Sequence, residues 1–252
     1  MAELRRHEVD VRATSQVRVL IGLLWRSAST PGRAVAALLA SSVSIAAGLA
    51  ARAAGNHDAT LVLADDLLLT LAVPLTALSV SAALFGNMRE DGSIVYLWMR
   101  PVPGVVVAFS AWVASLAFVL PTALLATAAP LAIARAPSEL FVSTIWAAGL
   151  ASAAYSALFL VPGLRLRRPV VASLVYWFAW EVLAGAVGGF VLRVSVIGYV
   201  RAVIAPAAEN VSPAVSVAAA PVSPMTAAAA CMTFTGVALL LAGIMFDRQE
   251  IR

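Results

Sequence analysis

A run of 34 residues without a charged side chain, Pro101–Ala134, is the feature that most constrains this chain. One membrane-spanning helix needs about 20 apolar residues, so this run is long enough to cross a bilayer with residues to spare. The rest of the sequence agrees: 62% of residues are hydrophobic, 12% are charged and the mean hydropathy is +0.94. Soluble domains have about 25% charged residues. We therefore expect an all-α membrane protein, with one transmembrane domain over residues 1–252.

Hydropathy and helix-breaking residues predict six membrane spans. Their expected ranges are 34–51, 67–86, 105–126, 140–161, 169–192 and 225–246. Proline removes a helical hydrogen bond, so the third span should bend at Pro121 and end in a turn near Pro130. The connection between the fifth and sixth spans is too apolar for a solvated linker and is broken by prolines, which favours short helices in the outer leaflet. Asp65 and Asp66 precede the second span, where they suit the helix dipole; an external cation or substrate site is the alternative.

The segment before the first span is predicted to be a charged arm followed by an interfacial helix. Apolar residues recur there at i, i+3, i+4, i+7 and i+8, the spacing of one helical stripe. These residues are Val17, Leu20, Ile21, Leu24 and Trp25. Pro31 should end this helix, which we expect to lie in the plane of the membrane surface.

Arginine supplies all 17 basic residues, which together with many Ala and Val residues indicates a GC-rich bacterial genome. Thirteen arginines fall in the two termini and in the second and fourth connections between spans, against four in the other connections. Positively charged loops stay in the cytoplasm. The chain is therefore expected in the bacterial cytoplasmic membrane, with both termini inside. The arginines are scattered, so nucleic acid is not an expected partner.

The connection between the second and third spans, residues 87–103, is short, charged and amphipathic. Arg89, Glu90 and Asp91 form a polar head, and Gly92 permits a turn. An apolar run follows and ends at Arg100. Such a segment can lie along the membrane surface and present its polar side to a partner.

Glu181 lies within the predicted fifth span, where a carboxylate is costly and indicates a functional position. On a helix it would share a face with Trp177, Ala184, Gly185 and Gly188, and Gly185 with Gly189 forms a Gly-x-x-x-Gly pair. The carboxylate is therefore expected to face a close helix contact, beside Trp180.

The sequence lacks the residues that several kinds of catalytic or binding site require. Without lysine the chain has no phosphate-binding Gly-Lys-Ser/Thr loop, so ATP hydrolysis within it is not expected. The two histidines, His7 and His57, lie outside the spans, and Cys231 is the only cysteine. We expect no catalytic residue, metal site or cofactor in this chain.

Residues 87–103 resemble the cytoplasmic loop of type-2 ABC exporter permeases, which reads Glu-x-Gly, an apolar stretch with Tyr-Leu, and then Arg-Pro-Val. The matching residues are Glu90, Gly92, Tyr96, Leu97, Arg100, Pro101 and Val102, and Pro103-Gly104 departs from the Ser-Arg of many members. A second similarity is Trp180-Glu181 followed by Leu192-Arg193, Val194-Ser195 and Tyr199.

The resemblance implies a coupling element that contacts an ATPase subunit and transmits its conformational change to the membrane spans. By this resemblance, coupling would involve Arg89, Glu90, Asp91, Gly92, Tyr96, Leu97, Arg100 and Pro101. The interfacial helix would be the family's connector helix, and the first and fifth spans would meet a second permease at a dimer seam. Glu181 would then be hydrogen-bonded across that seam, or would handle a substrate or proton.

By this resemblance the chain is a permease subunit of an ATP-driven exporter of hydrophobic or amphiphilic small molecules, drug-like or lipid-like. Two ATPase subunits carrying ATP and Mg²⁺ would bind beneath two permeases, identical or paralogous. A non-transporting membrane scaffold or immunity protein is the alternative, followed by a membrane-embedded enzyme. Co-purification with an ATPase distinguishes the exporter from both.

Overall fold

The computed structural model describes residues 21–22, 24–25, 31–90, 103–183 and 187–248, and the regular secondary structure in this part of the chain is helical, without strands. Four helical stretches are long and apolar enough to cross a membrane: His57–Gly86, Gly104–Ile133, Ser138–Arg165 and Pro224–Asp247. Two apolar stretches are shorter, Leu38–Ala54 and Pro169–Val182. The structure thus indicates a multi-pass membrane protein.

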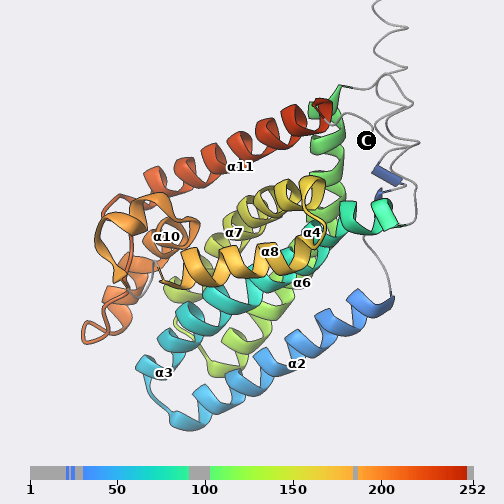
Figure 1. Ribbon diagram of the computed structural model, residues 1–252. Coiled ribbons are helices and arrows are strands. Elements are labelled where there is room, and N and C mark those ends of the chain that lie inside the picture. Colours follow the sequence, from blue (N-terminus) through green and yellow to red (C-terminus); the bar gives the residue numbers. More distant parts are fainter. Residues whose placement is uncertain (1–20, 23, 26–30, 91–102, 184–186, 249–252) are drawn as a thin grey trace, which may run out of the picture.

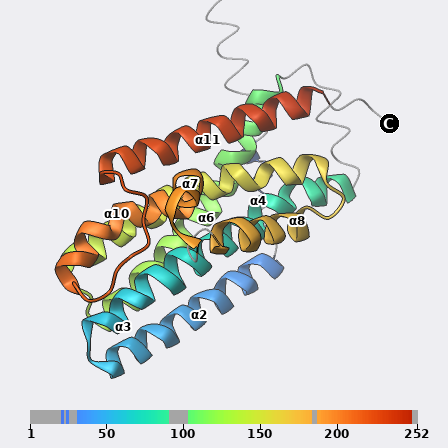
Figure 2. The ribbon, with the colours of Figure 1, turned by 60° about the vertical axis from the view of Figure 1, so that its left-hand side comes forward.

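Helix α7 (Ser138–Arg165) is the centre of the bundle and packs against α4 (Val73–Glu90), α6 (Gly104–Ala134), α10 (Val196–Val211) and α11 (Pro224–Asp247). Helices α2 (Pro31–Ala54) and α11 lie on opposite sides of it (Figures 1 and 2). The buried face of α7 alternates small residues with Tyr155 and Phe159, whose rings stack at 5.7 Å. Small residues let helix backbones approach closely, which accounts for its central place.

The second apolar stretch is one continuous helical path made of α3 (His57–Val62), the π-helix η1 (Leu63–Ala72) and α4. It begins at His57, after the N-cap Asn56, whose side chain accepts a hydrogen bond from the Ala59 amide at 2.8 Å, and Gly55 turns the chain just before it with a φ of 67°. The start is therefore ten residues earlier than the predicted Leu67. Asp65 and Asp66 consequently lie inside the helical path, and the prediction that they cap its beginning is wrong.

Helix α6 passes through both of its prolines, so the predicted turn near Pro130 is wrong. The Thr122 hydroxyl donates to the carbonyls of Phe118 and Val119, and the Thr127 hydroxyl donates to that of Ala123. Proline is tolerated inside a membrane-spanning helix where packed neighbours satisfy the backbone groups that it frees. The helix ends at Arg135, which adopts left-handed φ and ψ of 56° and 45°.

The fifth apolar stretch is broken at Gly188, before the predicted end at Leu192. Helix α8 (Pro169–Tyr176) continues as the π-helix η2 (Trp177–Val182), and the path then breaks at Gly188 and Gly189, whose φ values are 68° and 63°. Glycine adopts this backbone conformation without the clash that other residues meet. The short 3₁₀ helix η3 (Gly189–Val194) follows, and α10 then begins. A break in place of a helix lets η2 and the beginning of α10 lie against each other.

Helices α6 and α11 cross closely where α6 begins and α11 ends. A Cβ atom added to Gly243 would lie 2.7 Å from the Val105 Cα atom, so this crossing requires glycine. The Asp247 carboxylate accepts a hydrogen bond from the Gly104 amide at 2.7 Å. The last turn of α11 therefore caps the first turn of α6.

The remaining helices differ from their predicted spans by a few residues at each end.

Candidate functional site

The buried charged side chains in the described ranges are Asp65, Glu181 and Arg201, and all three contact α10 or belong to it. A charge removed from water is costly unless it is paired or fully hydrogen-bonded. Charged groups inside a membrane protein are therefore rare and usually functional. Their concentration around one helix identifies this region as the candidate site.

Glu181 lies in η2, is 1% exposed, and accepts four hydrogen bonds. Oε2 receives the Ile197 amide at 2.8 Å and the Tyr155 hydroxyl at 3.0 Å. Oε1 receives the Val196 amide and the Tyr176 hydroxyl, each at 3.2 Å. An ionised carboxylate only accepts hydrogen bonds, so four donors suit this form of the group.

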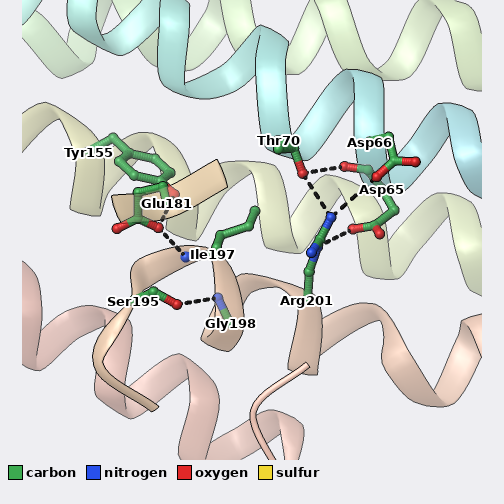
Figure 3. Close-up of polar contacts among 9 residues, drawn as sticks. All are labelled: Asp65, Asp66, Thr70, Tyr155, Glu181, Ser195, Ile197, Gly198 and Arg201. Atoms are coloured by element: carbon green, nitrogen blue, oxygen red, sulfur yellow. Dashed lines mark hydrogen bonds and ion pairs between the residues drawn. The ribbon is translucent and has the colours of Figure 1, made fainter. Parts of the chain in front are cut away.

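The two amides that reach Glu181 are the first two of α10, whose N-cap is Ser195. The Ser195 hydroxyl accepts the Gly198 amide at 3.2 Å, and Figure 3 shows this bond beside the Glu181 contact. The first amides of a helix have no partner within it, and the helix dipole favours negative charge at this end. Ser195 and Glu181 together satisfy three of these amides. The beginning of α10 is thus held by a side chain from another helix.

Arg201, one turn further along α10, joins that helix to η1. Its Nε atom lies 2.7 Å from Asp65, and its Nη2 atom lies 3.3 Å from Asp66 and 3.2 Å from the Thr70 hydroxyl (Figure 3). The Asp65 side chain is 12% exposed, whereas the Asp66 side chain is 64% exposed. Arg201 therefore balances the negative charge of Asp65 at close range and that of Asp66 only weakly.

Thr70 closes the contacts into a ring. Its hydroxyl donates to the Asp65 carbonyl at 2.9 Å, and its own carbonyl accepts the Trp177 indole N–H at 3.2 Å. Trp177 belongs to η2, as Glu181 does. The ring therefore runs from η2 through Glu181 to α10, through Arg201 to η1, and through Thr70 and Trp177 back to η2. We call these contacts the polar ring.

The polar ring can hold helices in place, but its buried carboxylate is not open to a ligand. Both Glu181 oxygens are occupied by donors of the same chain and the residue is almost fully covered. Asp66 is the member that faces open space. Over the ranges described, no group of three His, Cys, Asp or Glu residues could hold a metal ion.

The predicted intramembrane residues occupy different positions. Trp177 is buried in the polar ring, while Trp180 is 41% exposed and donates to the Val194 carbonyl at 3.3 Å. Gly188 lies in the break and not on the helical face of Glu181, which corrects that part of the prediction. Gly185 lies outside the described residues. The partners of Glu181 come from its own chain, whereas the resemblance suggested a bond across a dimer seam.

Most of the predicted coupling residues lie in the segment 91–102, outside the described residues. These are Asp91, Gly92, Tyr96, Leu97, Arg100 and Pro101. Arg89 and Glu90 form the end of α4. Of the predicted connector helix, Val17 and Leu20 are also outside the described residues. Leu24 is fully buried, Ile21 packs against the main core, and the Trp25 ring lies 6.3 Å from that of Phe118.

Sequence reasoning missed Tyr155, Tyr176, Thr70 and Arg201 as members of the site. Arg201 carried one available signal, because it is a lone charge in the apolar stretch 194–208. Nothing local connects it to Asp65, 136 residues away. A scan against protein-family models finds no match for this chain, and a search of curated proteins finds none either.

Proposed function

We propose that this chain is the permease subunit of an ABC exporter in a bacterial cytoplasmic membrane. Six spans would place both termini inside, with the four long apolar stretches joined by the shorter α2 and α8–η2. The proposed family rests on the resemblance of residues 87–103 and of Trp180-Glu181 to type-2 exporter permeases. Two ATPase subunits carrying ATP and Mg²⁺ would bind at residues 87–103 and at the connector helix.

The observation that carries the proposal is the broken fifth helix. After the break η3 leads into α10, and the polar ring fixes the beginning of α10 against Glu181. Short helices between the fifth and sixth spans are what the resemblance implies, and the Trp-Glu motif is the point to which they attach. A buried network that fixes a non-spanning helix suits a protein whose halves move as rigid bodies.

A second permease is part of the proposal, and exposed apolar residues on α2, α8 and η2 support it. Leu38 and Leu39 are 70% and 62% exposed, and Val175 and Phe178 are 60% and 62% exposed. Such faces fit lipid or a second copy. The substrate would be a hydrophobic or amphiphilic small molecule moved outward through the seam.

The test is affinity purification from the native membrane in mild detergent, with identification of the proteins that accompany this chain. The proposal expects an ABC ATPase, and ATP hydrolysis by the purified complex. A scaffold or immunity protein would purify with a different partner, and a membrane-embedded enzyme would purify alone and turn over a substrate without ATP. Either of those results would replace the exporter proposal.

A further inference from the structure

Two apolar cavities follow one another in the groove between α2 and the path η1–α4. The first has a volume of about 420 Å³ and the second about 430 Å³, within the range of small-molecule sites. Leu67 and Leu71 line both cavities, and the α2 side continues from Val43 in the first to Ala47 in the second. The two cavities therefore form one elongated groove, which we call the α2 groove.

Asp66 lines the second cavity of the α2 groove, and Ser79 lines the first. They are 13 residues apart on one helical path, or about 20 Å at about 1.5 Å per residue. The hydroxyls of Ser44, Thr76, Ser79 and Thr122 in its wall donate to carbonyls of their own helices. The body of the groove is therefore apolar in character and suits an extended hydrocarbon.

Charge distinguishes the second cavity of this groove from the first. Among the described residues that line the two cavities, Asp66 carries the only charge. Its counter-ion Arg201 is committed to Asp65 at 2.7 Å and reaches Asp66 only at 3.3 Å. Two carboxylates and one guanidinium leave one negative charge, located on the side chain that is 64% exposed. A carboxylate in apolar surroundings is stabilised by a cation, and the groove provides the space for one.

We propose that the α2 groove binds an elongated amphiphile with one positive charge, with its apolar body along Leu67 and Leu71 and its cationic head at Asp66. As a transport substrate site this rests on the proposed function, whereas binding itself does not. The polar ring then has a second role, because Arg201 keeps Asp65 compensated and leaves Asp66 available to the ligand.

The test uses three rod-shaped fluorescent probes that share a diphenylhexatriene body. One has a trimethylammonium group, one is uncharged, and one has a propionate group. Each is titrated into the full chain in zwitterionic lipid nanodiscs, and protein-free nanodiscs give the background. We expect saturable binding, with the cationic probe bound about tenfold more tightly than the neutral one, since close charge pairs supply about 1.4 kcal/mol or more. The anionic probe should bind most weakly.

Asp66→Asn should make the cationic and neutral probes bind alike, and Asp66→Glu should retain most of the preference. Glu209→Gln removes an exposed carboxylate outside the groove and should change neither dissociation constant. Ala47→Phe narrows the groove and should weaken every probe, while Ala46→Phe, on an exposed position outside it, should not.

Equal binding of the three probes by the unmodified chain would overturn the proposal, whatever the variants do, and would identify the groove as an ordinary lipid contact. Non-saturable binding would also overturn it. A third contrary result is cross-linking of two copies through a cysteine at Ala47 without probe binding, which would make the groove an interface. Each of these results leaves the exporter proposal in place, because that one depends on the ATPase.

Discussion

The amide of Ile197 lies 2.8 Å from the Glu181 carboxylate, so the first turn of α10 rests on a side chain from η2. Between the two residues the chain leaves η2, breaks at two glycines and passes through η3. The bond therefore joins the two segments on either side of this break. It also gives the buried carboxylate a hydrogen-bond donor.

Replacing Glu181 tests this bond directly. Glutamine keeps one acceptor oxygen but puts an NH₂ group where the other oxygen met a backbone amide, so one amide loses its partner. We expect Glu181→Gln to lower the free energy of unfolding by about 1–3 kcal/mol and Glu181→Leu to lower it by more. Thermal unfolding in detergent measures both, with Glu209→Gln as the control. A glutamine variant as stable as the parent would show that the carboxylate is not needed.

The buried ion pair between Arg201 and Asp65 should be strongly coupled. Arg201→Met leaves the buried Asp65 charge without its partner, which costs about 3–5 kcal/mol, and Asp65→Leu leaves Arg201 only the more distant, exposed Asp66. The double variant removes both charges and should recover part of that loss. A double-mutant cycle from thermal unfolding gives the coupling free energy. Additive single effects would contradict the pairing.

Glycine spacing on α11 provides a matched pair of substitutions. An added methyl group at Gly243 would meet the Val105 backbone, so Gly243→Ala should destabilise the fold by about 1–3 kcal/mol. A Cβ at Gly236 meets nothing within 4 Å, and Gly236→Ala should be neutral or stabilising by about 0.5–1 kcal/mol. Both are measured by thermal unfolding. Equal effects would mean that α6 and α11 do not cross at Gly243.

The proposed topology is tested by labelling single cysteines in intact cells, in a Cys231→Ala background. Asn56 and Asn210 are exposed in the structure and should react with an impermeant maleimide from outside. Arg167 is also exposed but should react only after the cells are opened. Labelling of Arg167 in intact cells would reject the arrangement with six spans and cytoplasmic termini.

Coupling to an ATPase predicts a specific defect in residues 87–103. Glu90→Arg or Gly92→Trp should leave the chain in the membrane at normal amounts while abolishing substrate-stimulated ATP hydrolysis. Expression is checked by immunoblot and hydrolysis by phosphate release from the purified complex. Full stimulation in both variants would make this segment an ordinary connection.

Hydropathy was sufficient to predict an all-helical membrane protein, because apolar runs of the required length leave few other solutions. Prediction from the sequence failed at proline and glycine, because each of these residues can either lie within a helix or end it. Pro130 was predicted to end a helix that continues through it, and Gly188 was predicted to lie on a helical face but turns the chain instead. Local sequence does not record which neighbours satisfy the freed backbone groups.

The site was predicted only in part for a related reason. A lone carboxylate in an apolar stretch identified Glu181, and Trp177, four residues earlier in η2, also belongs to the polar ring. Its hydroxyl and amide donors come from α7, α8 and α10, and single-sequence patterns do not show how those helices meet. Arg201 and Asp65 are joined by tertiary structure alone.

The π-helical turn of η1 makes the polar ring sensitive to chain length. Asp65 and Thr70 are five residues apart, and the Thr70 hydroxyl reaches the Asp65 carbonyl because a π-turn pairs residues at that separation. Deleting one residue between them would allow an ordinary α-helical path from α3 into α4. The shortened helix would still be long and apolar enough to cross a membrane, yet Arg201 would no longer meet the carboxylate of Asp65 and the hydroxyl of Thr70 on one side. In this part of the chain an insertion or deletion of a single residue is therefore a more drastic change than most substitutions.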